Sequence, residues 1–163
     1  MSELENLTPA EISRDRMRFT RNTASSRLAI LAILFDVFFF VSIYKSDVGT
    51  YYYTILIGAS IIYNLVFMLL TFLSSEGVKN YQTGYSYLMI ALGVIQIVRI
   101  FIIPTDAHAA FVEDVQVMGD GQFLWCVVCL ALSALCLFAG AVINLKKASA
   151  LRSHIASLEA SKA

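Results

Sequence analysis

Four long apolar runs dominate this sequence, and they cover residues 28–44, 51–73, 85–103 and 123–145. They contain only two charged residues, Asp36 and Arg99. Each run has about the 17–25 residues that a helix needs to cross a hydrocarbon core roughly 30 Å thick. In lipid, only helices and closed barrels satisfy their backbone, and these runs lack the alternation of barrel strands. The pattern predicts an all-α integral membrane four-helix bundle, which forms one domain over the whole chain.

Composition excludes an ordinary soluble domain. Hydrophobic residues make up 58% of the 163 residues and charged residues 15%, whereas soluble domains carry about 45–50% and about 25%. No catalytic, cofactor-binding, nucleotide-binding or metal-ligating motif rises above chance spacing. We therefore expect no enzymatic site, no cofactor and no nucleic-acid partner. The expected surroundings are a lipid bilayer and either a membrane-protein partner or further copies of the chain.

Lysine and arginine are distributed unevenly around the four runs. One side of the predicted membrane carries Arg14, Arg16, Arg18, Arg21, Arg27, Lys79, Lys146, Lys147, Arg152 and Lys162. The other side carries only Lys45. The positive-inside rule then predicts a multi-pass protein of the cell (cytoplasmic) membrane with both termini in the cytoplasm.

Three further short amphipathic helices are predicted outside the membrane. A capping box from Thr8 to Glu11 starts a cytoplasmic helix over residues 9–23. The cytoplasmic tail 146–163 extends the fourth run, with an apolar stripe of Ala148, Leu151, Ile155 and Leu158.

In the outer loop, apolar residues at helical spacing predict a short surface helix, namely Phe111, Val115 and Met118. Pro104 is expected to end the third membrane helix, because proline removes a helical hydrogen bond.

Polar residues inside the apolar runs are the main candidates for a functional site, and they are Asp36, Asn64, Gln96 and Arg99. A charge at the bilayer centre costs a few kcal/mol, so such groups usually face inward and pair. At a rise of 1.5 Å per residue, Asp36 and Arg99 lie about 18 and 21 Å along two helices that run in the same direction. We therefore predict an ion pair between them.

Small and polar residues recur every three or four positions in each run. The longest such stripe is in the fourth run, with Cys126, Cys129, Ser133, Cys136 and Gly140, followed by Asn144. The other runs have shorter stripes. In the first run the stripe is Ala29, Ala32 and Asp36; in the second it is Ser60, Asn64, Phe67 and Thr71; in the third it is Gly93, Gln96 and Arg99. Such stripes let membrane helices approach closely. Facing the interior of the bundle is the default interpretation, and the alternative is that the stripe of the fourth run faces a helix of another chain.

Cys126 and Cys129 form a CxxC motif near the outer end of the fourth run. Four helices with a CxxC at this place are similar to the vitamin K epoxide reductase family over those four residues only. That resemblance implies thiol redox chemistry, which requires a second cysteine pair in an outer loop. The chain has 3 cysteines in all, and the remaining one, Cys136, lies in the same run. Small packing residues are therefore the favoured interpretation.

A carboxylate in the first helix resembles small multidrug transporters, which use it to bind and release protons. A nearby Arg99 would hold Asp36 ionised and argues against that role. Claudins and tetraspanins have cysteines in their outer loops, and these loops contain none.

Three functions remain open from the sequence. The first is an accessory or scaffolding subunit of a larger membrane complex. The second is a small oligomeric transporter or channel, with the four intramembrane polar residues along its path. The third is a membrane thiol oxidoreductase that uses Cys126 and Cys129.

Overall fold

A computed structural model of the chain describes residues 21–44, 54–112 and 114–160. Its elements are α2 (Thr23–Tyr44), α4 (Thr54–Lys79), α5 (Thr83–Ile100), α6 (Ile103–Ala109), β1 (Phe111–Val112), β2 (Val115–Gln116) and α7 (Asp120–Ala160). Almost all of the predicted N-terminal helix 9–23 lies outside the described residues. Its last part, Arg21 and Asn22, precedes α2 in non-helical backbone.

Four helices are long and apolar enough to cross a membrane, as judged by length and composition among the described residues. The candidate spans are Thr23–Tyr44, Gly58–Lys79, Thr83–Ala109 and Asp120–Ser157. The helices extend beyond the apolar runs of the sequence, because polar residues next to the runs continue the helical backbone. The largest extension is in α7, whose 41 residues make it about 60 Å long.

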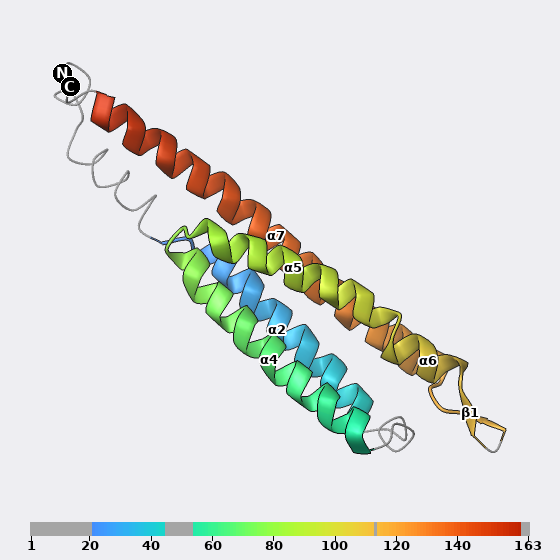
Figure 1. The fold of residues 1–163 in the computed structure, drawn as a ribbon. Coiled ribbons are helices and arrows are strands. Elements are labelled where there is room, and N and C mark those ends of the chain that lie inside the picture. The colour runs from blue at the N-terminus through green and yellow to red at the C-terminus, as the bar shows by residue number, and fades with distance from the viewer. Residues whose placement is uncertain (1–20, 45–53, 113, 161–163) are drawn as a thin grey trace.

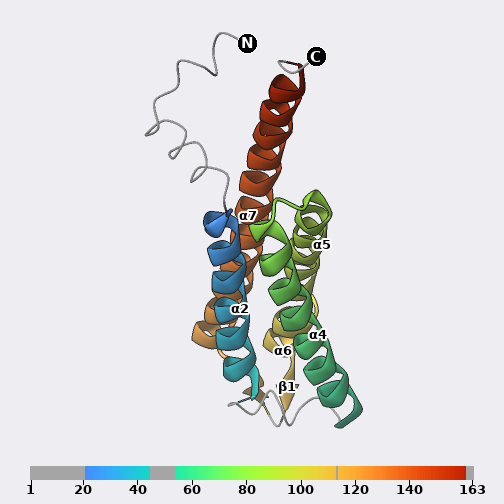
Figure 2. The ribbon, with the colours of Figure 1, turned by 90° about the vertical axis from the view of Figure 1, so that its left-hand side faces the viewer.

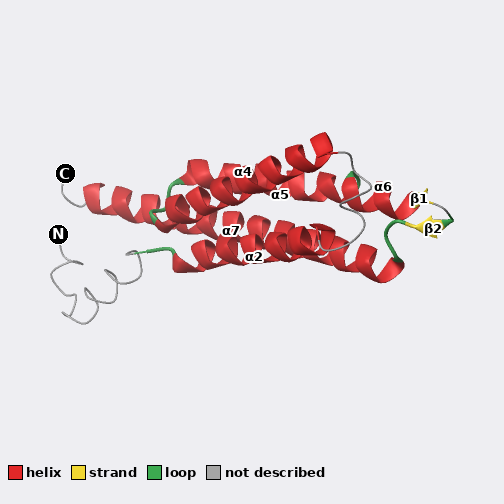
Figure 3. Cartoon of the chain, turned by 90° about the horizontal axis from the view of Figure 1, so that it is seen from below, coloured by secondary structure: helices red, strands yellow, loops and turns green. Residues whose placement is uncertain are grey.

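The four long helices lie side by side and contact one another in a closed ring. α2 packs against α4 and α7, and α5 packs against the same two helices. Neighbours run antiparallel, as Figures 1 and 2 show. α7 continues well past the ends of the other helices, on the side where α2 begins (Figure 3). Every long helix therefore packs against two neighbouring helices, and its outward face contacts no other long helix among the described residues.

Burial follows a spacing of three and four residues on each helix. On α4 the buried residues include Asn64, Phe67, Thr71, Ser74 and Val78, and on α2 they include Ala29, Ala32, Asp36, Phe39 and Ile43. Such heptad spacing is typical of helices that pack at a shallow crossing angle. The outward faces carry exposed leucine, isoleucine, valine and phenylalanine, which suits contact with lipid tails. The sequence periodicity therefore specifies which face of each helix is buried.

The turn between α4 and α5 has two hydrogen bonds that close the end of a helix. Tyr81 N donates to the carbonyl of Val78 at 3.2 Å, and Gln82 N donates to that of Gly77 at 3.3 Å. This is a Schellman motif, and Tyr81 occupies its left-handed position with a φ of 59°. Gly77 also allows α5 to approach, since an added Cβ would lie 2.1 Å from Cδ2 of Tyr85. The tight connection keeps α4 and α5 in register.

The end of the molecule that carries α6 and the hairpin differs from the sequence prediction in two ways. α5 already ends at Ile100, and Pro104 lies in the first turn of the next helix, α6. Proline suits that place, because the first backbone N–H groups of a helix have no partner within the helix. The prediction that Pro104 ends the third helix was therefore wrong.

The predicted surface helix over Phe111–Met118 is wrong as well, because this stretch contains an antiparallel hairpin in which Phe111 pairs with Gln116. Asp114 has a φ of 62° at the hairpin turn, a conformation that aspartate tolerates better than most residues. The apolar residues of this stretch are three or four positions apart, and that spacing is compatible with a helical turn and with a short hairpin. The sequence pattern was therefore ambiguous. The short helix of this loop is α6, which begins eight residues earlier.

Replacing Gly77 with alanine tests the close contact between α4 and α5. We expect Gly77→Ala to lower the free energy of unfolding by about 1–3 kcal/mol, because the new methyl group overlaps the ring of Tyr85. Gly84→Ala is the matched control, since its added Cβ meets nothing within 4 Å. Thermal unfolding in detergent micelles measures both. Equal unfolding temperatures for the two variants would contradict the tight packing at Gly77.

Candidate functional site

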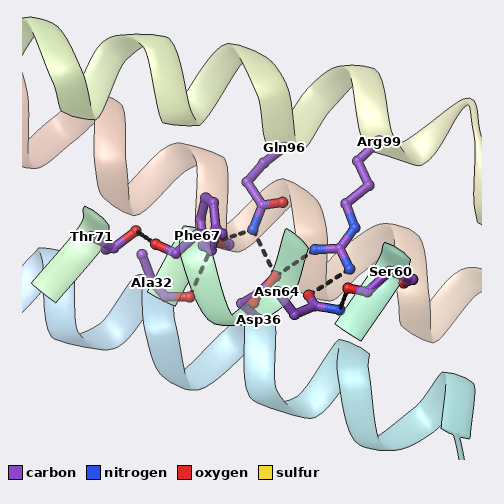
Figure 4. Close-up of polar contacts among 9 residues, drawn as sticks. Ala32, Asp36, Ser60, Asn64, Phe67, Thr71, Gln96 and Arg99 are labelled. Carbon is purple, nitrogen blue, oxygen red and sulfur yellow. Dashed lines mark hydrogen bonds and ion pairs between the residues drawn. The ribbon is translucent and has the colours of Figure 1, made fainter. Parts of the chain in front are cut away.

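The polar layer is a set of buried side chains at one level of the membrane interior, and all four long helices contribute to it. It consists of Asp36 from α2, Asn64 from α4, Gln96 and Arg99 from α5, and Ser133 from α7. Each is completely buried except Arg99, which is 5% exposed. The structure thus brings together all four intramembrane residues that the sequence singled out (Figure 4).

Asp36 and Arg99 form a buried ion pair at the centre of the layer. Nη1 of Arg99 lies 2.9 Å from Oδ1 of Asp36. Nε2 of Gln96 donates a second hydrogen bond to the same oxygen at 2.9 Å. A charge-assisted bond of this length is among the stronger polar interactions in proteins. The two opposite charges compensate each other where both side chains are buried.

Arg99 is held by a second helix and by two aromatic rings. Its Nη2 donates to Oδ1 of Asn64 at 2.6 Å, and Nδ2 of Asn64 donates to the carbonyl of Ser60 at 2.9 Å. The guanidinium carbon lies 4.4 Å from the ring centre of Phe39 and 4.8 Å from that of Tyr63. Both distances are within the range of a cation–π interaction. Arg99 therefore connects α5 with α2 and α4.

Gln96 extends the layer to α7. Its Nε2 also lies 3.2 Å from Oγ of Ser133, whose hydroxyl donates to the carbonyl of Ala32 at 3.0 Å. Ser133 thereby links α7 to α2 and α5. The resulting chain of hydrogen bonds reaches all four helices, as Figure 4 shows in part.

The layer offers fixed charges and amides rather than reactive groups. Asp36 accepts its hydrogen bonds from two amide or guanidinium donors, and no thiol or imidazole belongs to the layer. Among the described residues, no three side chains of His, Cys, Asp or Glu are grouped as metal ligands. The side chains of the polar layer can fix the four helices relative to one another and can bind groups that form hydrogen bonds.

A second group of buried polar residues lies toward the end of the helices at which α2 begins, and we call it the inner cluster. It consists of Asn22, Ser25, Ser26, Ser75, Ser86 and Asn144. Asn144 of α7 accepts a bond from Nδ2 of Asn22 at 2.8 Å and donates to Oγ of Ser86 at 2.8 Å. The hydroxyls of Ser26 and Ser75 lie 2.8 Å apart and join α2 to α4.

Only Asn144 of the inner cluster was noted from the sequence, as the last residue of the stripe. Asn22 lies before the first apolar run and Ser75 after the second, where polar residues are usually exposed. The available signal was position: Asn22, Ser25 and Ala29 continue the three-and-four spacing of buried residues toward the start of α2. Because the first apolar run was taken to begin at residue 28, the residues of this continuation were not considered.

The stripe on α7 is buried inside the chain. Cys126, Cys129, Ser133 and Cys136 are at most 6% exposed. At Gly140, an added Cβ would come within 2.6 Å of Cε of Met89. The stripe therefore packs against α2 and α5, and the alternative that it faces another chain is wrong for this fold. The longest small-residue stripe belongs to the helix with the most extensive contacts, which explains its length.

All three cysteines are free thiols. Sγ of Cys126 donates to Oγ of Ser42 at 3.7 Å, which ties α7 to α2 near the end at which α2 finishes. Cys129 packs with Leu130 and Met118 in an apolar cluster at the same end. The CxxC residues thus have structural contacts that account for their burial.

No family model matches this chain, and no curated protein and no solved structure is similar to it. Function is therefore inferred from the residues and their geometry.

A double-mutant cycle tests whether Asp36 and Arg99 stabilise each other. We expect Asp36→Leu and Arg99→Met to cost about 3–5 kcal/mol each, because each leaves an unpaired charge in the membrane interior. The double variant should lose much less free energy of unfolding than the two single variants lose together. Unfolding titrations in detergent micelles give the three free energies. Asp36→Leu combined with Ser74→Ala is the control, and its effects should add within about 0.5 kcal/mol; additivity for Asp36 and Arg99 as well would refute the coupling.

The inner cluster makes a separate prediction at Asn144. Asn144→Leu should lower the free energy of unfolding by about 1–3 kcal/mol, because Asn22 and Ser86 lose their partner in a buried place. Asn80→Ala, in the exposed turn between α4 and α5, should change it very little. The same unfolding titration compares them, and a larger effect for Asn80 would mean that the inner cluster does not stabilise the fold.

Proposed function

We propose that this chain is a four-helix bundle of the cell membrane with both termini in the cytoplasm. The charges at the two ends of the described helices support this orientation. One end carries Arg21, Arg27, Lys79, Lys146, Lys147 and Arg152, and the other carries Asp106, Asp114 and Asp120. Positive charge is retained on the cytoplasmic side during insertion. The closed ring of contacts among the four long helices supports the bundle.

Within that membrane, the protein is proposed to act as an accessory or scaffolding subunit of a larger complex. The observation that carries this proposal is that the residues of the polar layer bond to one another within one chain. Arg99 has two side-chain partners and two aromatic neighbours, and all come from other helices of the same chain. A buried pair of opposite charges of this kind suits an element that fixes helix register. A transport path must instead expose its polar groups in turn to the two sides.

The projecting part of α7 is the feature through which a partner is proposed to attach. After Lys147 the helix continues to Ala160, beyond the ends of its neighbours (Figures 1 and 3). Leu151 is half-buried and Ile155 is 45% exposed on this extension. An amphipathic helix that continues out of the membrane suits the juxtamembrane helix of a partner protein. Its apolar residues Ala148, Leu151 and Ile155 recur at three- and four-residue spacing.

A small transporter or channel is the second candidate. The observation in its favour is that polar groups from α2, α4, α5 and α7 meet at one level inside the chain. If ions or small molecules crossed here, Asp36→Asn would change their flux in proteoliposomes. An unchanged flux, or no flux at all, would leave the scaffold as the better proposal.

Affinity purification tests the scaffold. The chain, tagged at its C-terminus and purified from its native host in mild detergent, should bring along a membrane protein in stoichiometric amount. Leu151→Glu with Ile155→Glu should reduce recovery of that partner about tenfold or more, since charges replace the apolar contacts. Ser153→Glu with Ser157→Glu, on exposed positions of the same segment, is the matched control and should retain it. Recovery of a pure homo-oligomer instead would overturn the scaffold proposal.

A further inference from the structure

His108 lies where three segments meet, at the end of the molecule that carries α6 and the hairpin. It belongs to the last turn of α6, and its ring stacks on that of Phe123 from α7, with 4.4 Å between the ring centres. Its Nδ1 lies 3.1 Å from Nε2 of Gln116 on β2 and 3.1 Å from the carbonyl of Met118. Its Nε2 lies 3.7 Å from Oδ1 of Asp120 at the start of α7. One imidazole therefore contacts the hairpin, the connection that follows it, and α7.

The two neighbours of Nδ1 make opposite demands on this atom. Gln116 offers an N–H group, which needs the lone pair of an unprotonated Nδ1, whereas the carbonyl of Met118 needs an N–H group on Nδ1. Rotating the Gln116 amide does not remove the conflict, because its Nε2 also donates to the backbone carbonyl of His108 at 2.8 Å. Exchanging the amide nitrogen and oxygen would place two oxygens at that contact. The presence or absence of a proton on Nδ1 therefore decides which neighbour the ring binds.

The second ring nitrogen links this choice to the charge of the ring. Nε2 faces the carboxylate of Asp120, which favours a proton on Nε2. In a neutral imidazole, a proton on Nε2 leaves Nδ1 free to accept from Gln116. The other neutral form would point an N–H group at that of Gln116 and a bare nitrogen at Asp120. The imidazolium has a proton on both nitrogens, so it can donate to the carbonyl of Met118 while its charge is opposite to that of Asp120.

We propose that His108 is a pH-sensitive fastening of the hairpin, in which the neutral ring binds Gln116 and the protonated ring binds the carbonyl of Met118 instead. Histidine side chains change their charge between about pH 5 and 8. The side chain is 31% exposed, so it can take up a proton from water. The bond from Gln116 to Nδ1 is present above this pH range and is lost as the pH falls through it. Gln116 keeps its bond to the backbone carbonyl of His108, so the hairpin is loosened and stays attached.

Other titratable groups lie on the segments that pack around His108. The carboxylates among the described residues at this end are Asp106 on α6, Asp114 at the hairpin turn and Asp120 on α7. The adjoining apolar cluster, which includes Ala107 and Met118, also contains Tyr44 from α2 and the thiols of Cys126 and Cys129 from α7. The competition at Nδ1 involves only Gln116 and Met118, so a measurement on the ring nitrogens separates it from the titration of these groups.

The chemical shifts of the ring nitrogens test the two states. The chain has 2 histidines, so His154→Gln leaves His108 as the only one. We expect NMR of the ¹⁵N-histidine-labelled variant in detergent micelles to show, at about pH 8, a ring with its proton on Nε2 and a bare Nδ1. At about pH 5 both nitrogens should be protonated. A neutral ring with its proton on Nδ1, or a ring whose charge does not change between these pH values, overturns the proposal.

Amide hydrogen exchange tests whether the hairpin responds. The amide of Val117 donates to the carbonyl of Ala110 at 3.0 Å, next to Gln116. Corrected for the intrinsic exchange rate, its protection should fall about threefold between about pH 7.5 and about pH 5.5, because one hydrogen bond of the hairpin is lost. Gln116→Met should abolish this fall, because methionine has no N–H group to offer Nδ1.

A matched control and a second variant accompany this measurement. Thr105→Val removes a side-chain hydrogen bond to the carbonyl of Ile100 on the same side of the hairpin and should retain the fall in protection. If Gln116→Met does not fold, His108→Gln replaces it, because a glutamine at this position does not titrate. The same fall in protection in the native chain and in His108→Gln would refute the fastening.

Discussion

The fold depends on a pair of opposite charges that is buried among the four long helices. A single charge at this depth would oppose insertion by a few kcal/mol. Asp36 and Arg99 remove this penalty only if α2 and α5 are held at one level and at a fixed distance. The bonds of Arg99 to Asn64, and of Gln96 to Ser133, extend the same requirement to α4 and α7. The pair therefore restricts how far any of the four helices can slide or rotate.

Close approach of the helices is what makes these short bonds possible, and small side chains provide it. Ala29 and Ala32 on α2 and Ala141 on α7 are buried beside one another in one core cluster. Gly140 brings the backbone of α7 so near to α2 that an added Cβ would lie 3.3 Å from the carbonyl of Ser25. Packing of this kind replaces the hydrophobic effect, which does not drive association between helices inside lipid. Small residues and polar bonds are thus two parts of one mechanism.

Much of this arrangement could be predicted from the sequence because the membrane restricts the possible solutions. The apolar runs reveal the four long helices, and a rise of 1.5 Å per residue places Asp36 and Arg99 at similar depth. The ends of the helices were harder to predict, since water and polar side chains permit several backbone conformations there. Pro104 therefore starts a helix instead of ending one, and residues 111–116 form a hairpin.

Other features depend on side-chain detail that a residue's type does not reveal. A tyrosine in an apolar run usually indicates the membrane interface, whereas Tyr63 lies beside Arg99. A serine such as Ser26 becomes informative only when a second hydroxyl, here that of Ser75, is known to face it. Such pairings arise between residues far apart in the chain, and no local spacing encodes them.

The continuity of α7 has a mechanical consequence. Ser133, in the middle of this helix, belongs to the polar layer, while Ala160 lies about 40 Å further along the same rod. A sideways shift of about 4 Å at Ala160 would correspond to a tilt of only about 6° about Ser133 on that length. The tip of α7 and the polar layer are therefore joined by one continuous helix. The same continuous helix carries Ser133 of the polar layer and Asn144 of the inner cluster, so no loop separates either contact from the far end of α7.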